Sequence, residues 1–385
     1  MKHCLQIVLF LCLCSPLAAQ IKTGAELTEE YFPMLRDRQI GVFTNHTGRI
    51  GATHLVDSLM RAGFRIVSVF APEHGFRGDA DAGEKIEDGC DSLTGIPVIS
   101  LYKYKTGKPT PAQLAKIDLL LVDIQDVGLR FYTYYITLFH LMDACAEQGK
   151  PVLLLDRPNP NGFYVDGPIL DMKYKSGVGW LPIPVVHGMT LGELAQMING
   201  EQWLPQQRKC RLTVIPCRNY THQSLYDLPL PPSPNLPNMK SVYLYPSLCL
   251  MEGTVLSVGR GTDFPFQVYG HPEMQNCIFY FQPSTRAGAK NPLYADRTCW
   301  GVDLRRYPDD YIRQHGLDLH YLIDAYRRMN IGKAFFKPFF RNLIGVDYVQ
   351  TMIEEGKSAQ EIKQQWQADV ALFIEQRRPY LLYAE

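Results

Sequence analysis

The sequence has no excess of either charge. It contains 39 lysines and arginines against 39 aspartates and glutamates, and neither sign gathers into a long block. Proteins that bind nucleic acids normally carry a basic patch or a high isoelectric point, so this balance argues against a nucleic-acid partner. With 385 residues, the chain exceeds the size at which a single core usually stops growing, which predicts two domains.

After residue 20, closely spaced cysteine pairs are also lacking. Three of the ten cysteines fall in the first twenty residues, and the other seven are odd in number and widely scattered. Without a Cys-x-x-Cys motif, the pattern predicts neither a disulfide framework nor a metal or redox pair. We expect most of the seven to be buried small hydrophobic residues. They are Cys90, Cys145, Cys210, Cys217, Cys249, Cys277 and Cys299.

Long apolar runs are absent after the N-terminus, so we expect no stable insertion into a membrane. Within residues 1–20, basic residues precede an apolar run over 5–13, and small residues follow it. This order predicts an export signal cleaved near Ala19, and therefore a periplasmic or secreted protein. A lipoprotein anchored through Cys14 is the less favoured alternative, because the bulky Leu13 precedes that cysteine.

Several catalytic motifs are missing as well. The sequence has no Gly-x-Ser-x-Gly elbow, no phosphate-binding loop and no dinucleotide fingerprint after its first predicted strand, and Glu73-His74 lacks a second histidine four residues on. We therefore predict no cofactor and no metal. A metal site remains an alternative without support from spacing, and its ligands would come from Asn45, His46, His74, Asp123, Asp156 and His187.

What is present is an alternation of apolar strands and helices. This pattern is typical of an α/β fold with a mostly parallel sheet covered by helices on both faces. Strands are predicted at residues 40–43, 65–70, 97–102, 118–124, 151–155, 183–186 and 211–215, and helices at 53–61, 111–116 and 130–148. Thr190 with Glu193 forms a capping-box pattern that predicts the start of another helix.

A proline-rich stretch at residues 228–237 predicts a stiff connector. We place the domain boundary near 238, giving domains at 21–238 and 239–385. In the second domain, apolar residues at helical spacing predict one amphipathic helix over residues 358–378.

Polar or ionisable side chains follow five of the predicted strands. Because the carboxyl ends of parallel strands meet at one edge of a sheet, these side chains are expected to converge there. The Glu73 loop combines an acid, a base and a cation between glycines, which makes it the predicted core of the active site. The residues are Asn45 and His46; Glu73, His74 and Arg77; Asp123 and Asp126; Asp156 and Arg157; and His187.

A site led by carboxylates in an exported protein points to glycoside hydrolysis, which needs a protonated acid and a second group opposite it. We predict Glu73 as the general acid, assisted by Asp123 or Asp126. Other interpretations stay open: Asp126 could cap the helix at 130–148, and Tyr132 could pack in the core or stack on a sugar.

Structural roles are also open for other predicted site residues. Asp156 and Arg157 could form an internal ion pair, and His46 and His187 could be ordinary core histidines. The competing functions are a sugar-binding protein without hydrolytic activity, and a metal-dependent amidase or deacetylase.

Several longer motifs, in order along the chain, resemble the exo-β-N-acetylmuramidase family of bacterial peptidoglycan hexosaminidases. The resemblance covers nearly the whole chain after the predicted signal. It is carried by residues 70–78, 123–134, 156–160, 187–190, 233–237, 252–254 and 259–262.

The resemblance implies a Rossmann-like first domain, a smaller α+β second domain and an active-site cleft between them. It implies release of N-acetylmuramic acid from the non-reducing ends of peptidoglycan fragments, with Glu73 catalytic and Glu252 in a substrate-binding motif. Val255 departs from the asparagine expected there. The lactyl carboxylate of such a sugar would need a cation, for which the candidates are Arg77, Arg130, Arg157 and Arg260. The sugar's own acetamido group could replace the second carboxylate as nucleophile.

Overall fold

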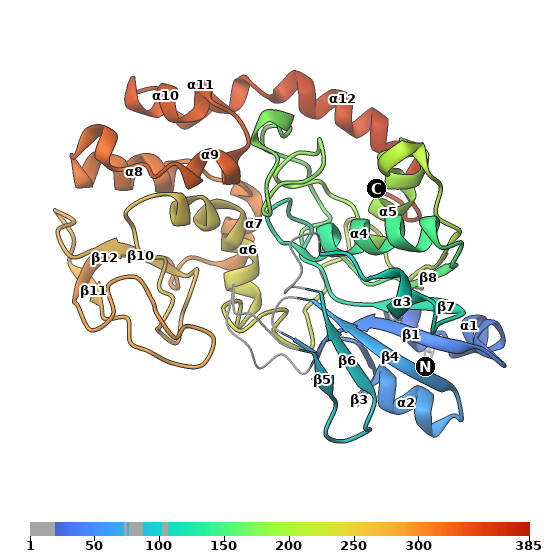
Figure 1. Ribbon diagram of the computed structural model, residues 1–385. Helices are drawn as coiled ribbons and strands as arrows, with labels where there is room; N and C mark the ends of the chain where they lie inside the picture. The colour runs from blue at the N-terminus through green and yellow to red at the C-terminus, as the bar shows by residue number, and fades with distance from the viewer. Residues whose placement is uncertain (1–19, 73–74, 77–87, 102–106) are drawn as a thin grey trace, which may run out of the picture.

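The computed structural model describes residues 20–72, 75–76, 88–101 and 107–385. Its largest element is a seven-stranded sheet with the order β5-β6-β4-β1-β7-β8-β9 (Figure 1). All neighbouring strands are parallel except β5 and β6 at one edge. The strands are β1 (Gln39–Thr44), β4 (Arg65–Ala71), β5 (Gly89–Cys90), β6 (Pro97–Ser100), β7 (Leu119–Asp123), β8 (Val152–Leu155) and β9 (Leu212–Ile215).

The direction of strand addition reverses between β1 and β7. From β1 the chain adds β4 and then β6 on one side, and it returns to place β7, β8 and β9 on the other side. This is the Rossmann arrangement, in which ligands bind beyond the carboxyl ends of the strands at the reversal point. The predicted fold class, a mostly parallel α/β sheet followed by a smaller domain, is confirmed.

Both faces of the sheet are buried. In β7, Leu119 and Leu121 belong to a core with α1 (Thr28–Leu35) and α2 (Leu55–Arg61). Leu120 and Val122 point to the opposite core. Side chains alternate across a strand, so a strand covered on both faces needs a continuous apolar run. The opposite core contains α4 (Tyr134–Glu147) and α5 (Leu191–Gly200); α3 (Pro111–Leu114) and the β2 (Arg49–Ile50)–β3 (Thr53–His54) hairpin complete this part.

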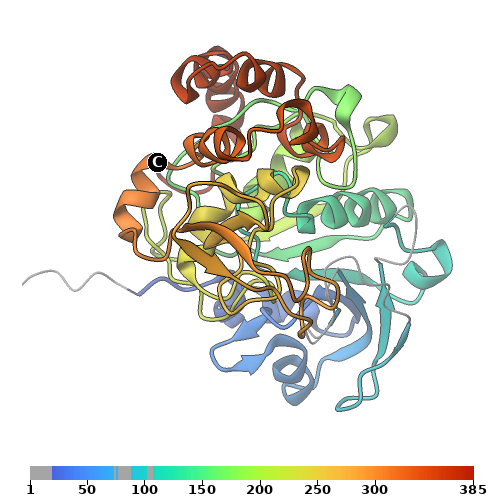
Figure 2. The same ribbon diagram turned by 90° about the vertical axis from the view of Figure 1, so that its left-hand side faces the viewer.

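The second part begins with α6 (Met239–Leu248), whose first turn is capped by the Asn238 side chain. It contains a three-stranded antiparallel sheet in the order β10-β12-β11 and a group of helices, seen on the left of Figure 1 and facing the viewer in Figure 2. Its elements are β10 (Val268–His271), β11 (Phe279–Phe281), β12 (Cys299–Asp303), α7 (Asp309–His315), α8 (His320–Met329), α9 (Phe339–Ile344), α10 (Tyr348–Glu354) and α11 (Ala359–Gln364).

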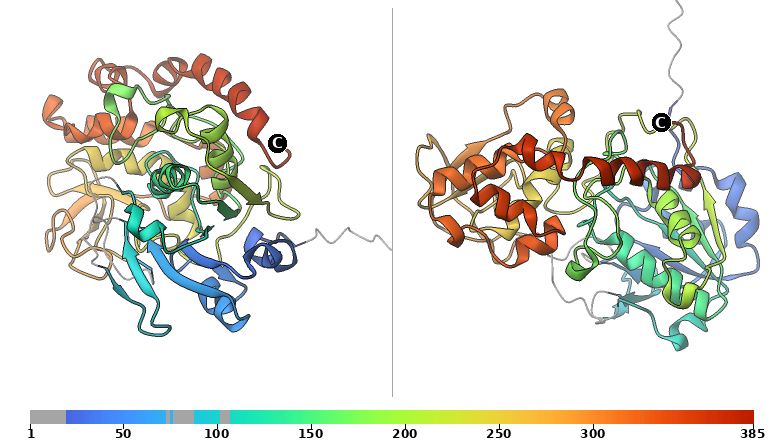
Figure 3. Two further views of the ribbon diagram at one scale, coloured as in Figure 1. Left: turned by 45° about the vertical axis from the view of Figure 1, so that its right-hand side comes forward. Right: turned by 90° about the horizontal axis from the view of Figure 1, so that it is seen from above.

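The last helix, α12 (Gln367–Arg377), returns to the first part, as Figure 3 shows from above. Beyond it, the Tyr383 hydroxyl donates to Asp156 Oδ2 over 2.6 Å, and the Leu382 amide donates to Glu193 Oε1 over 2.8 Å. These contacts attach the C-terminus to the exit of β8 and to α5. The two parts also share one large apolar core.

Two secondary-structure predictions are wrong. Residues 183–186 form no strand of the sheet; Val186 makes only isolated bridges to Leu129 and Asp166. Residues 358–378 form two helices, α11 and α12, because the chain bends at Trp366. The buried Trp366 indole donates a hydrogen bond to Asp166, a contact across 200 residues that no local pattern reveals.

Two local predictions, the capping box and the burial of most cysteines, are confirmed. Thr190 and Glu193 form the expected capping box at the start of α5. Five of the seven cysteines after residue 20 are buried, and all seven are free thiols. In the described part of the chain, no helix combines the length and the apolar character needed to cross a bilayer.

Candidate active site

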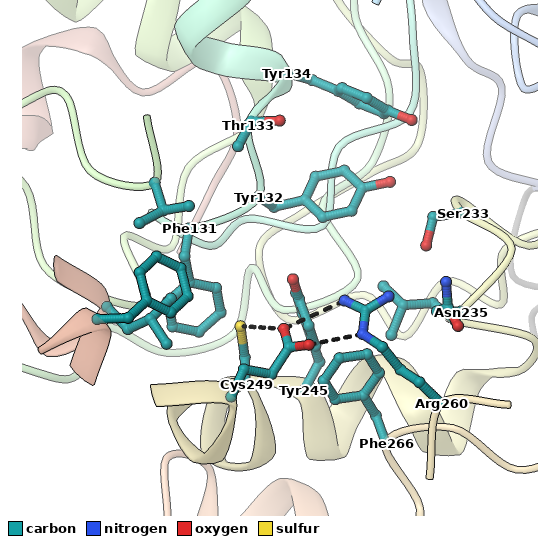
Figure 4. Close-up of a pocket in the computed structure, with 15 residues that line it drawn as sticks. Phe131, Tyr132, Thr133, Tyr134, Ser233, Asn235, Tyr245, Cys249, Arg260 and Phe266 are labelled. Carbon is teal, nitrogen blue, oxygen red and sulfur yellow. Dashed lines mark hydrogen bonds and ion pairs between the residues drawn. The ribbon is translucent and has the colours of Figure 1, made fainter. Parts of the chain in front are cut away.

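A cavity lies between the two parts of the molecule (Figure 4). Tyr132 and Tyr134 form one wall, at the start of α4, and Glu252 and Arg260 from the second part form the opposite wall. Ser233 and Asn235, from the proline-rich connector, close one side. The full lining is Phe131, Tyr132, Thr133, Tyr134, Val178, Ser233, Asn235, Leu236, Tyr245, Cys249, Glu252, Arg260, Phe266, Phe339 and Leu343.

Glu252 is positioned by a short 3-10 helix, residues Cys249–Gly253, that continues from α6. The Thr254 hydroxyl donates to the Met251 carbonyl over 2.7 Å and so closes the turn after Glu252. Gly253 packs directly against α9, where a Cβ would lie 2.4 Å from the Phe340 Cα. The Glu-Gly-Thr motif therefore fixes the direction of the carboxylate through its backbone.

Arg260 projects from a turn that only glycine neighbours allow. Gly259 and Gly261 have φ angles of 80° and 82°, in the left-handed region that side chains rarely adopt. The Thr262 hydroxyl closes the turn on the Gly259 carbonyl over 2.6 Å. The guanidinium lies over the Phe266 ring, 4.9 Å from its centroid.

Glu252 and Arg260 form a bidentate ion pair, with Arg260 Nε 2.6 Å from Oε1 and Nη2 3.2 Å from Oε2. Burial would lower the pKa of Arg260, but the charge and hydrogen bonds of Glu252 outweigh it and raise that pKa. Burial, with the nearby Glu252 charge, raises the pKa of the Cys249 thiol well above its ordinary value. Cys249 is therefore a neutral group in the wall and no thiolate nucleophile.

Hydrogen bonds hold the opposite wall to the proline-rich connector. Tyr132 donates to the Pro232 carbonyl over 2.8 Å, and His46 Nε2 lies 2.8 Å from the Pro231 carbonyl. Asn45 donates to the Tyr134 hydroxyl over 2.9 Å. Asn45 and His46 are thus predicted site residues that shape the wall without lining the cavity.

Asp126 is a buried carboxylate with two properties of a catalytic acid: an oxygen without a hydrogen-bond partner among the described residues and a raised pKa. Its Oδ1 accepts from the Gly128 amide over 2.7 Å, and its Oδ2 has no hydrogen-bond partner among the described residues. Burial raises the pKa of Asp126 to about 7. The helix-capping interpretation of Asp126 is wrong, because α4 begins only at Tyr134 and Thr133 precedes it.

His187 is buried and uncharged. Its Nδ1 accepts from the Met189 amide over 3.2 Å, so Nε2 carries the proton in the neutral ring. That Nε2 has no partner in the described part of the chain. Burial, with a contribution from Arg377, lowers the pKa of His187 to about 3.

Three predicted site residues have structural roles instead. Arg130 is completely buried, and its two terminal nitrogens donate to four backbone carbonyls, of Pro168, Ile183, Leu343 and Ile344. It ties the first part to α9 and is unavailable to a ligand. Both carboxylate oxygens of Asp156 are occupied, by Thr190, Gly192 and Tyr383.

Asp123 is the third correction. Its two oxygens bind Arg157, at 2.5 Å to Nε and 3.0 Å to Nη2, and the pair is almost fully buried. Asp123 therefore anchors the exits of β7 and β8 and does not face the cavity. Arg157 also lines a separate cavity with Thr47, Arg49 and Tyr226.

Glu73, His74 and Arg77 lie outside the described residues. Glu73 follows the end of β4 by two positions, and β4 pairs with β1, whose exit carries Asn45 and His46. After Glu73 and His74, the Gly75 amide donates to the Pro72 carbonyl. The buried Phe76 ring packs on His54, with 4.9 Å between the ring centroids.

Sequence reasoning missed several cavity residues. Ser233 and Asn235 lie in the proline-rich connector. Polar residues between prolines could have indicated that this connector contributes to a binding site. Tyr245, Cys249 and Phe266 gave no signal, because aromatic residues and cysteine on a helix or loop look like core residues. Val255 does not line the cavity; its backbone bonds Phe335 and Tyr294.

The raised pKa of Asp126 makes a testable prediction about stability. The folded protein keeps this proton up to about pH 7, whereas an unfolded aspartate releases it near its ordinary value. The free energy of unfolding should therefore fall as the pH rises from about 4 through 7. Asp126→Asn should remove this part of the dependence, at most about 4 kcal/mol at about 1.4 kcal/mol per pKa unit, in urea unfolding at several pH values.

The matched control is Asp369→Asn, which changes an exposed aspartate on α12 and should leave the pH dependence unaltered. An Asp126→Asn protein with the wild-type slope would show that Asp126 is ionised across this range. Burial also raises the pKa of Asp156, to about 6. Its contribution to the pH dependence of the unfolding free energy should remain in both variants.

Among the described residues, no group of three or more histidines, cysteines or acidic residues is arranged to hold a metal ion. The cavity instead brings together an ion pair, aromatic rings, a serine and an amide. This set suits a polar ligand with apolar faces and several hydroxyl groups.

Comparison with known proteins covers both parts of the chain. The N-terminal family model of exo-β-N-acetylmuramidase NamZ matches residues 40–240, and the C-terminal family model matches residues 243–383. The peptidoglycan β-N-acetylmuramidase NamZ of Bacillus subtilis strain 168 is 36% identical over 390 residues, covering 94% of this chain and 92% of that protein.

Two crystal structures of DUF1343 family proteins from Bacteroides fragilis NCTC 9343 are also similar. One has a TM-score of 0.90 at 58% identity and covers 95% of this chain and 100% of its own. The other has a TM-score of 0.78 at 28% identity, with 94% and 99% covered. Both similarities extend over the two parts of the molecule.

Proposed function

The chain belongs to the exo-β-N-acetylmuramidase NamZ family, and from this premise we propose that it is a glycoside hydrolase acting on peptidoglycan. It releases terminal N-acetylmuramic acid from the non-reducing ends of peptidoglycan fragments. The observation that carries the proposal is the 36% identity to a peptidoglycan β-N-acetylmuramidase over 94% of the chain. The cavity between the two parts supports it, because its polar and aromatic lining suits a sugar.

In the proposed mechanism Glu73 is the general acid that protonates the departing glycosidic oxygen. Asp126 is the second carboxylate, since Asp123 is committed to Arg157 and Asp126 keeps one oxygen without a partner. Asp126 would either activate water or orient the acetamido group of the sugar as nucleophile. The anomer released first, followed by NMR, distinguishes these two courses.

Arg260 is the proposed partner of the lactyl carboxylate. Among the candidates within the described residues, Arg130 and Arg157 are occupied by carbonyls and by Asp123, whereas Arg260 lines the cavity and uses only Nε and Nη2 on Glu252. Arg77 lies outside these residues and stays the alternative. Its Nη1 makes no hydrogen bond in the described part of the chain. A carboxylate from the sugar would therefore add to the ion pair without breaking it.

We further propose that the protein is exported and loses residues 1–20, which would place it with peptidoglycan outside the cytoplasm. The basic start, short apolar run and small residues near Ala19 support this step. N-terminal sequencing of the protein from its native compartment tests it.

The function is tested by incubating the protein with a disaccharide of N-acetylmuramic acid β-1,4-linked to N-acetylglucosamine. We expect both free monosaccharides by mass spectrometry. An unchanged disaccharide that still binds would instead identify a binding protein, and activity abolished by a chelator would identify a metal enzyme.

A further inference from the structure

A second cavity lies entirely in the C-terminal part and is lined by residues from α7, α8, β10 and β12 and the segments next to them. Figure 1 shows where these elements lie. It shares no lining residue with the cavity that contains Glu252 and Arg260. We call it the α7–α8 pocket and define it by Tyr269, Tyr307, Tyr311, His315, Tyr321 and Asp324. The proposed mechanism uses none of these residues.

One side of the α7–α8 pocket is a row of aromatic rings that begins just before α7 and continues along it. The centroids of Tyr307 and Tyr311 are 5.3 Å apart, and those of Tyr311 and His315 are 4.0 Å apart, with interplanar angles of 34° and 31°. Tyr307 and Tyr311 are 38% and 39% exposed, which is unusual for rings that merely fill a core. Rings at these spacings stack on one another, so the row offers a ligand partly exposed ring surface with the hydroxyl groups of Tyr307 and Tyr311 at its border.

The other side of the pocket is polar. The buried Tyr321 hydroxyl has no hydrogen-bond partner among the described residues. Asp324 Oδ2 accepts from the Tyr269 hydroxyl over 3.3 Å and from Arg328 Nε over 2.7 Å. A buried hydroxyl without a partner is rare and costs roughly 1–3 kcal/mol, so a ligand or water that bonds it would be stabilised here.

The imidazole ring of His315 also lines the pocket, and a hydrogen bond fixes its tautomer. Its Nδ1 lies 2.8 Å from the Tyr311 carbonyl, which can only accept, so Nδ1 carries the proton. In the neutral ring, Nε2 is then an acceptor. The pocket thus offers a donor and an acceptor beside aromatic rings. Its two carboxylates already have partners in the same lining, Arg328 for Asp324 and His320 for Asp318, so the pocket favours a neutral polar ligand.

We propose that the α7–α8 pocket is a second saccharide site, which binds N-acetylhexosamine units of a glycan strand away from the catalytic cavity. A pyranose ring has apolar faces and a border of hydroxyl groups, which matches the tyrosine row and the polar side. The proposal rests on the proposed function for the kind of sugar. Such a site would keep an exo-acting enzyme on an insoluble polymer between cleavage events.

The test uses chitohexaose, a chain of N-acetylglucosamine without lactyl groups, as a ligand that lacks the terminal residue the catalytic site is proposed to cleave. Titration calorimetry should show binding to the wild-type protein and at least a tenfold lower affinity for the Tyr307→Ala/Tyr311→Ala variant. Leu372→Ala, which removes an apolar side chain that is 69% exposed on α12, is the matched control and should bind like the wild type.

Co-sedimentation with insoluble peptidoglycan should fall in the double variant, while hydrolysis of a small chromogenic β-N-acetylmuramide stays at the wild-type rate. Equal binding of chitohexaose by the wild type and the double variant would overturn the proposal. So would binding of stem peptides in place of peptide-free glycan. If the wild-type protein did not hydrolyse the chromogenic substrate at all, the proposed function would be refuted. The saccharide-binding result would not be affected.

Discussion

Glu73→Gln should lower the kcat for hydrolysis of a chromogenic β-N-acetylmuramide by about 10²–10⁴-fold. Glutamine keeps the size of the side chain but cannot protonate the departing oxygen. The loss should be smaller for a substrate whose leaving group is a good phenolate, because such a group departs with little help from an acid. Comparing nitrophenyl and methyl muramides therefore separates loss of the acid from general damage.

The control is Glu355→Gln, which alters an exposed glutamate in the second part and should retain wild-type activity. Circular dichroism and thermal unfolding should show that Glu73→Gln folds normally. If this variant retained full activity on both substrates, the acid would have to be another residue, and Asp126 would be the first to examine.

The second large effect concerns stability. Arg157→Met should reduce the free energy of unfolding by about 3–5 kcal/mol, because it leaves the buried Asp123 carboxylate without its charged partner. The side chains of Arg157 and Asp123 are only 4% and 0% exposed, so the carboxylate would stay largely buried without its partner. Urea unfolding measures the difference. The double variant Asp123→Leu/Arg157→Met should recover much of the loss, since no buried charge is left unpaired.

Arg218→Met is the matched control, because Arg218 pairs with Glu29 and Glu30 at the surface. Exposed pairs typically contribute less than about 1 kcal/mol, so this change should be close to neutral. If Arg157→Met lost no more stability than Arg218→Met, the Asp123–Arg157 pair would not anchor the strand exits.

The sheet could be predicted well because its signal is local. A strand such as β7, covered on both faces, must be apolar at every position, and residues 118–124 show this directly. The capping box at Thr190 and Glu193 is likewise contained in four residues. Residues 183–186 look equally apolar, yet their backbone hydrogen-bonds to Arg130 and Asp166 instead of joining the sheet.

The roles of the polar residues were harder to predict. Arg130, Asp156 and Asp123 all follow or adjoin strands, as catalytic residues often do. Their partners come from positions 34 to 227 residues away along the chain, such as Arg157 for Asp123 and Tyr383 for Asp156. A short sequence window cannot show whether such a partner will arrive, so it cannot separate a satisfied buried charge from a reactive one.

The sequence by itself determined the α/β class, the alternation that fixes the strands, and the ordered motifs of the family. These depend on contacts between near neighbours and on the period of apolar residues. Only the tertiary structure decided which charged side chains are paired in the interior and which face the cavity. That choice depends on desolvation and on hydrogen bonds between distant segments, which exist only once the second part and the C-terminus have packed against the first sheet.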